Sequence, residues 1–222
     1  MKNNISEINK DSFWSLIDQA REQCGQDQDA FYQWLQDCLM ALGPEQAMIF
    51  DSFVHGYRDA AYKYGLWIAA DIICDGCTDD GFMDFRGWLI SQGRDVYMAA
   101  LKDPDSLADI PTQGRCYLED LSYVGDYAYE KLTGRDSFEC FDPVAYLALA
   151  AELEKDIVYG EGIEYPYDWG DIPAYLPKLC AKYMKPEELA RLVEMRADNW
   201  NQTSLSIQKA RSSFRKSKKV VG

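Results

Sequence analysis

Carboxylates gather in the middle of the sequence, on both sides of a turn rich in Asp and Gly. Five aspartates fall between residues 71 and 84: Asp71, Asp75, Asp79, Asp80 and Asp84. Residues four apart share one face of a helix, and carboxylate oxygens are the ligands that hard divalent cations prefer. The spacing makes this cluster a candidate cation or ligand site. Helix capping and ion pairing are the favoured alternative, because Asp79 and Asp80 directly precede an apolar helical run.

The apolar run after Asp80 combines aromatic rings with basic side chains. Phe82, Phe85 and Trp88 fall on one side at helical spacing, while arginines at 86 and 94 offer hydrogen-bond donors. This combination suits a small-ligand pocket. The alternative, which we favour, places the rings in the core and lets the first arginine neutralise a buried aspartate. The hypothetical binding set has seven members: Asp75, Asp79, Asp80, Asp84, Arg86, Trp88 and Arg94.

A second group of acidic and aromatic residues lies farther along the chain. It forms a hypothetical partner surface of six residues: Glu119, Tyr123, Asp126, Glu130, Tyr165 and Trp169. The first four recur at intervals of three and four, so a helix would place them on one face. Aromatic side chains among carboxylates suit the recognition of a basic partner protein. An ordinary solvated helix face and loop are the favoured alternative.

Familiar catalytic and metal-binding patterns are missing from the sequence. Cys74 and Cys77 form a Cys-x-x-Cys pair, but structural zinc needs two further ligands and no second pair follows. His55 is the only histidine, and it falls in a helical segment without a nucleophile elbow, so a catalytic base is the less favoured interpretation. We therefore expect no catalytic residue, no bound metal and no cofactor.

The chain is strongly acidic, with a net charge of -14 and a pI near 4.5. A field of this sign repels nucleic-acid phosphates and anionic lipid headgroups, so general nucleic-acid or membrane binding is not expected. Basic residues concentrate in the last segment of the chain. After Asp198 this segment contains six Lys and Arg residues and no Asp or Glu. We expect residues 199–222 to form a mobile basic tail beyond a helical domain at 1–198.

Hydropathy and cysteine usage predict a cytoplasmic protein. No apolar stretch approaches the roughly 20 residues that cross a bilayer, and the first ten residues are polar. Seven cysteines without regular spacings favour reduced thiols over a disulfide framework. The oligomeric state stays open.

Apolar residues at three- and four-residue spacing predict a mainly α-helical fold. We expect a single-domain bundle of orthogonal and antiparallel helices with a loop-rich C-terminal part. The expected helices span 11–18, 29–42, 44–64, 66–74, 82–92, 94–101, 117–132, 144–153, 176–183 and 186–198. Thr78 or Asp79 can cap the helix that carries Phe82. We predict that the Asp79-Asp80 turn does so, and that Asp80→Ala costs about 1 kcal/mol of stability.

Three runs of residues resemble a known family. They are Phe13-Trp14-x-Leu16-Ile17, the run from Asp79-Asp80-Gly81-Phe82 to Trp88-Leu89-Ile90-Ser91-Gln92-Gly93-Arg94, and Asp103-Pro104-Asp105-Ser106-Leu107-Ala108. They are similar to an uncharacterised bacterial family, the domain of unknown function numbered 4240, mostly over residues 11–134. This resemblance implies a mostly helical single domain and supplies no catalytic residue.

The sequence favours an acidic protein-interaction or regulatory module, of the inhibitor or immunity type, that binds a basic partner. The alternative is a metal-assisted hydrolase or phosphoryl-transfer enzyme. In that enzyme the carboxylates from Asp71 to Asp84 would hold the cation, and Arg86 or Arg94 would stabilise the developing anion.

Overall fold

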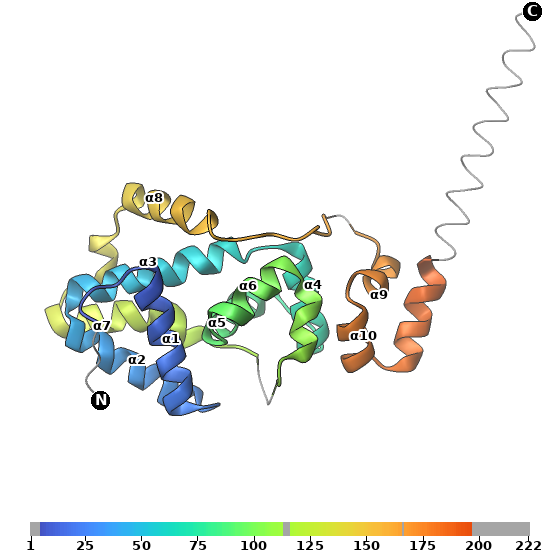
Figure 1. The fold of residues 1–222 in the computed structure, drawn as a ribbon, viewed down its shortest axis with the longest axis horizontal. Helices are drawn as coiled ribbons and strands as arrows, with labels where there is room; N and C mark the ends of the chain where they lie inside the picture. The colour runs from blue at the N-terminus through green and yellow to red at the C-terminus, as the bar shows by residue number, and fades with distance from the viewer. Residues whose placement is uncertain (1–4, 113–115, 166, 197–222) are drawn as a thin grey trace, which may run out of the picture. The chain divides into compact units, whose positions relative to one another are not determined.

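The computed structural model describes residues 5–112, 116–165 and 167–196, and within these ranges helices are joined by loops without any strand (Figure 1). The prediction of a mainly α-helical fold is confirmed. The chain divides into two compact units, residues 1–162 and residues 163–222, and each is described by itself. The tail predicted at 199–222 lies outside the described residues.

The described residues of the first unit form eight α-helices and three short 3-10 helices. These are α1 (Lys10–Cys24), α2 (Gln28–Leu42), α3 (Pro44–Ala60), α4 (Tyr64–Cys74), α5 (Asp79–Ser91), α6 (Arg94–Lys102), η1 (Pro104–Asp109), η2 (Glu119–Tyr123), α7 (Val124–Thr133), η3 (Ser137–Cys140) and α8 (Pro143–Glu154). The second unit contains η4 (Trp169–Asp171), α9 (Ile172–Tyr175), α10 (Pro177–Tyr183) and a further helix over 186–196. No helix in the described ranges has the length and apolar character needed to span a bilayer.

Side-chain caps fix where the first helices begin. Asn9 accepts the backbone N–H of Ser12 at 3.0 Å, while the Ser12 hydroxyl accepts the Asn9 N–H at 2.8 Å. This reciprocal capping box starts α1 at Lys10, ahead of the start expected at Asp11. Gly43, with a φ of 98°, ends α2 and lets Pro44 open α3 as expected.

The core of the first unit is built around α3. This helix contacts α1, α2, α5, α7 and α8, and Figure 1 shows α8 on one side of it and α7 on the other. An aromatic cluster joins α1, α3 and α6, in which the Trp14 indole N–H donates to the Tyr57 hydroxyl at 3.0 Å. Tyr97 donates its own hydroxyl to the Tyr57 carbonyl at 2.6 Å. The buried polar atoms of these rings are therefore satisfied.

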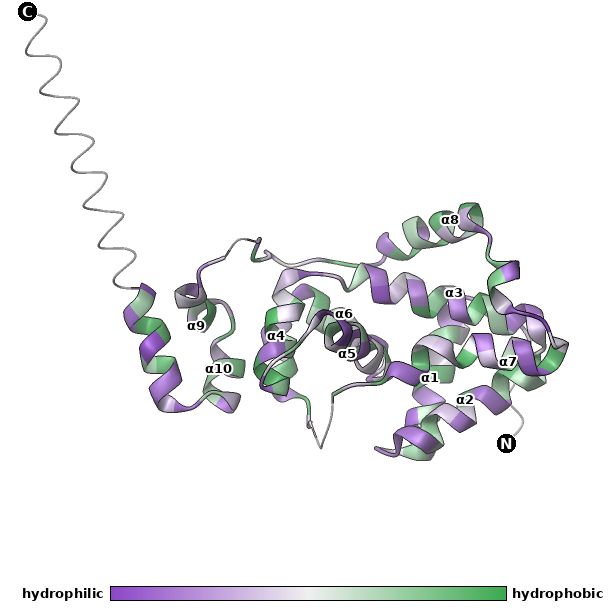
Figure 2. Cartoon of the chain, turned by 180° about the vertical axis from the view of Figure 1, so that it is seen from behind, coloured by the Kyte–Doolittle hydropathy of each residue, from purple (hydrophilic) through white to green (hydrophobic). Residues whose placement is uncertain are grey.

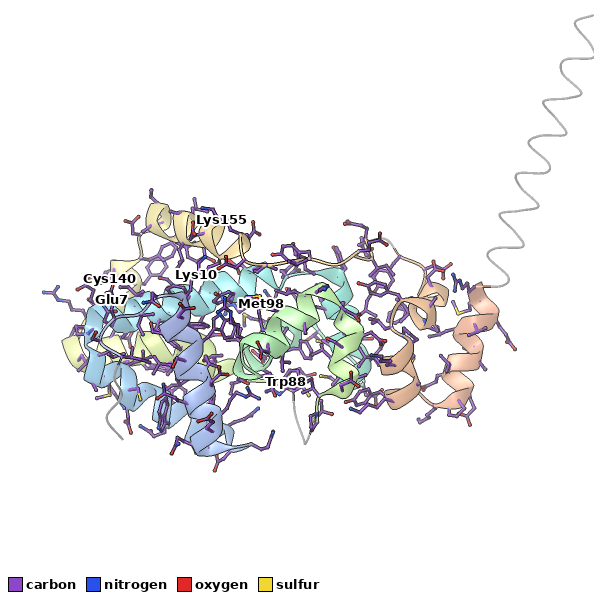
Figure 3. The ribbon with its side chains drawn as sticks, viewed as in Figure 1. Glu7, Lys10, Trp88, Met98, Cys140 and Lys155 are labelled. Atoms are coloured by element: carbon purple, nitrogen blue, oxygen red, sulfur yellow. The ribbon has the colours of Figure 1, made fainter. Side chains whose placement is uncertain are left out.

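The C-terminal end of the apolar helix α8 packs on α3. A Cβ at Gly56 would lie 2.7 Å from Leu153 Cδ1, so the glycine permits this approach. Lys10 of α1 pairs with Asp156 at 2.7 Å and lies near Lys155 in Figure 3. Figure 2 shows hydrophobic segments along α8, and Val144 remains 76% exposed.

Two of the expected helices are interrupted. The helix expected at 44–64 ends at Ala60, and α4 begins only at Tyr64. The prediction of one continuous helix over 117–132 is also wrong in its first part. Residues 119–123 form the 3-10 helix η2, and α7 begins only after it. The end of that element is confirmed, since Gly134 takes a left-handed φ of 68°.

Candidate functional site

Hydrogen bonds from its own side chains fix the turn between α4 and α5. Asp75 ends α4 in the left-handed backbone conformation, with a φ of 55°. The Asp71 carboxylate accepts the Cys77 backbone N–H at 2.8 Å, and the Thr78 hydroxyl accepts the Gly81 N–H at 3.1 Å. Asp71 is therefore a structural residue of the turn, and Thr78 is the N-cap of α5.

Asp79 and Asp80 occupy the first turn of α5, so the prediction that they cap this helix is wrong. Thr78 lies one position before Asp79, and its hydroxyl accepts one of the free backbone amides at the helix start, that of Gly81. The two carboxylates still face the positive end of the helix dipole, where an acid is stabilising.

The segment before η2 packs closely against α5. The Leu118 backbone N–H donates to the Asp84 carbonyl at 3.0 Å. A Cβ at Gly87 would lie 2.5 Å from the Leu118 carbonyl oxygen, so no larger residue fits there without displacing this segment. Gln28 of α2 donates its side-chain amide to the Tyr117 carbonyl at 2.9 Å. These contacts hold the start of η2 beside the middle of α5.

This packing creates a cavity of about 480 Å³, which we call the acidic cleft. Its wall consists of Gln28, Gly76, Thr78, Gly81, Asp84, Tyr117, Leu118, Glu119 and Asp120. Among these residues three are acidic and none is basic. Two carboxylates named separately in the sequence, Asp84 and Glu119, therefore line one cavity.

Asp84 is the most constrained carboxylate of the acidic cleft. Its Oδ1 atom is buried and has no hydrogen-bond partner within the part of the chain that the structure describes. Burial raises the pKa of Asp84, and the negative charges of Glu119 and Asp80 raise it further. A cation entering the cleft would lower the electrostatic cost of this arrangement, so the site is chemically suited to a positively charged group.

Arg86 does not neutralise a buried aspartate, contrary to the alternative drawn from the sequence. It is 6% exposed, and its guanidinium donates to the carbonyls of Phe82 at 3.2 Å and Arg58 at 2.8 Å. The guanidinium also lies 4.8 Å from the ring centroids of Tyr62 and Phe82. Burial, followed by the neighbouring Arg58 charge, lowers the pKa of Arg86. Arg86 is therefore held in the core by carbonyls and aromatic rings.

Trp88 and Arg94 lie apart from the acidic cleft. Trp88, labelled in Figure 3, is 5% exposed and stacks near Phe85 with ring centroids 5.2 Å apart. Arg94 opens α6 and forms an exposed ion pair with Asp11 of α1 at 3.4 Å. Of the seven residues proposed as a binding set, Asp84 alone lines the acidic cleft.

The cysteines near the cleft are free thiols. Cys74, Cys77 and Cys116 form no disulfide. The Cys116 thiol, and less strongly the Tyr117 hydroxyl, hydrogen-bond to Cys74 and lower its pKa, whereas burial raises the pKa of Cys77 to about 12. Over the described ranges, no group of three His, Cys, Asp or Glu side chains is placed to hold a metal ion.

His55 contacts two charged residues of its own helix. Its Nε2 lies 3.3 Å from the Asp51 carboxylate, and its Nδ1 lies 2.7 Å from an Arg58 nitrogen. The sequence singled out His55 and missed Asp51. A signal was present, because Asp51 sits between Phe50 and Val54 on the apolar stripe of α3 and is buried with them.

The six residues of the hypothetical partner surface are distributed over both units. Glu119 and Tyr123 belong to η2, whereas Asp126 and Glu130 belong to α7. Tyr165 and Trp169 lie in the second unit. There they form a row of rings with Tyr167, whose centroid is 6.4 Å from that of Tyr165 and 5.6 Å from that of Trp169.

Sequence reasoning missed four polar residues of the acidic cleft, namely Gln28, Thr78, Tyr117 and Asp120. Asp120 follows Glu119 directly, and that pair of acids ahead of an apolar residue was the available signal. Gln28 comes from α2, about ninety residues away in sequence, and no local pattern marks it.

Comparison with known proteins places the chain in a family. A family model described as a protein of unknown function (DUF4240) matches residues 8–131, which is more than half of the 222-residue chain and includes every residue of the acidic cleft. Neither the curated proteins nor the solved structures contain a match. The resemblance drawn from the motifs between Phe13 and Ala108 is thus confirmed, and the chain belongs to the DUF4240 family.

Proposed function

We propose that this protein is an acidic interaction or regulatory module, of the inhibitor or immunity type, that binds a basic partner protein. The acidic cleft receives one Lys or Arg side chain of that partner. The observation that supports this most directly is that Asp84, Glu119 and Asp120 line one accessible cavity whose wall contains no basic residue.

The electrostatics of the cleft favour this occupant. A unit charge about 4 Å from a carboxylate gains about 4 kcal/mol at an effective dielectric constant of 20, before desolvation is subtracted. Three carboxylates line the cleft, so a cationic side chain meets several favourable interactions at once. The net charge of -14 adds steering over a longer range, and this steering weakens as salt shortens the Debye length.

Exposed tyrosines on η2 and α7 supply apolar contact area. Tyr123 of η2 and Tyr127 of α7 are 37% and 47% exposed, and their ring centroids are 6.2 Å apart. Glu130 is exposed one turn farther along α7. An aromatic pair beside acidic groups resembles the anchor and rim of a protein interface. The proposal takes the cytoplasm as the compartment, in keeping with the free thiols.

The test is the binding of a fluorescein-labelled peptide rich in Lys and Arg, followed by anisotropy. Asp84→Asn and Glu119→Gln each remove one charge from the acidic cleft. Asp95→Asn removes the same charge from an exposed position on α6, outside the cleft, and is the matched control. We expect each cleft variant to weaken binding about tenfold and the control to weaken it by less than about twofold.

Equal weakening by all three variants would show that only the general negative field attracts the peptide, and the cleft proposal would be abandoned. A separate activity assay tests the alternative that the protein is a hydrolase. Turnover of p-nitrophenyl phosphate that requires Mg²⁺ or Mn²⁺ and disappears in Asp84→Asn, with the helical circular dichroism unchanged, would favour the enzyme instead.

A further inference from the structure

Two cysteines from distant parts of the sequence meet at the end of α4. Cys74 is the last residue of that helix and is half-buried, whereas Cys116 lies shortly before η2 and is 3% exposed. The thiol of Cys116 hydrogen-bonds to the sulfur of Cys74. Sulfurs in hydrogen-bonding contact need only a small movement of their side chains to reach the geometry of a disulfide.

Hydrogen bonds on both sides hold this contact in place. The Leu118 N–H donates to the carbonyl of Asp84 on α5 at 3.0 Å, which fixes the chain two residues after Cys116. The Asp71 carboxylate accepts the Cys77 N–H at 2.8 Å, which fixes the turn that follows α4. The two thiols are therefore brought together by the packed fold.

The surroundings make Cys74 the nucleophile of the pair. The hydrogen bond from Cys116 lowers the pKa of Cys74, burial opposes this change, the Tyr117 hydroxyl lowers the pKa again, and the Asp71 charge raises it, which leaves it at about 7. The same hydrogen bond, followed by burial, raises the pKa of Cys116. Near neutral pH Cys74 is therefore partly a thiolate, the reactive form of cysteine, while Cys116 keeps its proton.

Cys77 is closer to Cys74 in sequence but is held differently. The Cys77 thiol donates to the Thr78 carbonyl oxygen at 3.6 Å, and burial raises its pKa to about 12. Between the two cysteines, Asp75 and Gly76 both take positive φ values, of 55° and 113°, so the chain turns sharply after α4. The thiol that hydrogen-bonds to Cys74 thus comes from position 116 rather than from the Cys-x-x-Cys pair.

We propose that Cys74 and Cys116 form a redox-sensitive site, in which a hydroperoxide oxidises Cys74 and Cys116 then completes a disulfide. With hydrogen peroxide, the Cys74 thiolate attacks one oxygen, an S–O bond forms as the O–O bond breaks, and the released hydroxide takes up a proton to become water. The sulfur of Cys116 then attacks the sulfenic acid. An S–S bond forms as the S–O bond breaks, and the second hydroxide leaves with the thiol proton as water. In total, two thiols are oxidised to one disulfide and one peroxide is reduced to two waters.

The disulfide would join α4 to the segment that leads into η2. Tyr117 follows Cys116 directly, and both Tyr117 and Gly76 line the acidic cleft, where the Tyr117 hydroxyl lies 3.4 Å from the Gly76 carbonyl oxygen. Oxidation would therefore restrain one wall of that cleft. The chemistry of the two thiols does not depend on what the cleft binds, so this proposal stands apart from the proposed function.

The test treats the reduced 222-residue chain with equimolar hydrogen peroxide at pH 7.5, alkylates the remaining thiols with N-ethylmaleimide, and maps tryptic peptides by mass spectrometry. Trypsin separates the pair, because Cys74 and Cys77 fall in the peptide 64–86 and Cys116 falls in the peptide 116–131. We expect these two peptides to be linked, with a mass lower than their sum by two hydrogens, and to be released by dithiothreitol. The intact mass establishes that the link lies within one chain.

The rate of linking tests whether the fold is responsible. We expect the link to form at least about tenfold faster in the folded protein than in the protein unfolded in urea, because only the fold supplies the contact and the lowered pKa.

Three variants assign the roles of the cysteines. Cys77→Ser is the matched control and should form the same link at an unchanged rate. Cys116→Ser should leave the sulfenic acid of Cys74 without a partner, so that dimedone traps it. Cys74→Ser should form no link and no dimedone adduct at Cys116. Circular dichroism of each variant establishes that it is folded.

Several results would overturn the proposal. A disulfide within the peptide 64–86 would assign the oxidation to the Cys-x-x-Cys pair instead. A link between two chains, oxidation of Cys74 to a sulfinic acid without a link, or equal rates in the folded and unfolded protein would also refute it. If none of the three thiols reacts in the folded protein, the cysteines serve as small buried packing residues and the proposal fails.

Discussion

Replacing Asp51 by Asn should make the protein more stable at neutral pH. The carboxylate is 7% exposed, one of its oxygens has no partner among the described residues, and burial raises its pKa well above the usual value. An unsatisfied buried polar group costs about 1–3 kcal/mol, and a charged one costs more than a neutral one. Asn still leaves a polar group at the position of Oδ1, but it removes the buried charge, and its amide oxygen can accept from His55. We therefore expect a gain in unfolding free energy of about 1 kcal/mol at pH 7.5.

The expected pH dependence follows from the direction of the shift. At and below pH 3.8, the usual pKa of Asp, Asp51 is largely protonated in both the folded and the unfolded protein. Its ionisation then contributes little to the free energy of unfolding. As pH rises above this value, the unfolded chain ionises first, so the wild-type protein loses stability until the folded pKa is passed. The advantage of Asp51→Asn should therefore be small near pH 4 and larger at pH 7.5.

Other charged groups near Asp51 must be held constant in this comparison. They are His55 and Arg58 on α3, Asp126 on α7, and Asp142 and Tyr146 at the start of α8. His55 has a lowered pKa, so its contribution has the opposite sign and is lost as pH falls below about 6.5. Making the same comparison in a His55→Gln background removes this second titration.

Urea denaturation followed by tryptophan fluorescence measures the effect, because Trp14 and Trp88 are buried in the first unit. If Asp51→Asn lowers the unfolding free energy at both pH values, the carboxylate is a well-partnered structural group. In that case the argument from its unpartnered oxygen fails.

Two further predictions concern α4 and α5. Thr78→Ala should cost about 1 kcal/mol of stability because it removes the N-cap hydrogen bond, whereas Asp80→Ala should cost less than about 0.5 kcal/mol. Urea denaturation midpoints measure both changes. A larger loss of stability in Asp80→Ala than in Thr78→Ala would show that Asp80 is the capping residue. Cys74 should react with iodoacetamide about tenfold faster than Cys77 at pH 7.5, because hydrogen bonds lower its pKa while burial raises that of Cys77. Peptide mass mapping measures both rates, and a faster Cys77 would contradict this.

Local sequence signals predicted most of the helices, because their caps are local. Gly43 and Pro44 set the boundary between α2 and α3 within two residues. The prediction failed at residues 117–123, where the apolar spacing of a helix is present but the backbone forms η2. The cause is a tertiary contact, since Leu118 donates to the Asp84 carbonyl and approaches α5 over Gly87. A periodicity argument contains no information about such a partner.

The candidate sites depend even more on packing between distant segments. Asp84 and Glu119 were each named from the sequence, but their convergence required η2 to lie on α5. Arg86 was assigned to an aspartate because charge pairing is the usual role of a buried arginine, whereas two carbonyls and two rings hold it in place. Sequence alone ranks possible partners by type, and the fold decides which of them lie within reach.

Two positions in the first unit, Asp84 and Asp51, follow the same electrostatic arrangement. In each, a carboxylate with a raised pKa has a buried oxygen without a partner among the described residues. The charge of Arg58 lowers the pKa of both carboxyls in part, but its guanidinium is hydrogen-bonded to His55 and Ser122. A fold selected for stability alone would pair these charges or replace the acids, since an uncompensated buried charge is destabilising. Keeping the acids ionisable is useful when a cation arrives from outside, because the ligand then supplies the interaction that the chain leaves unmade.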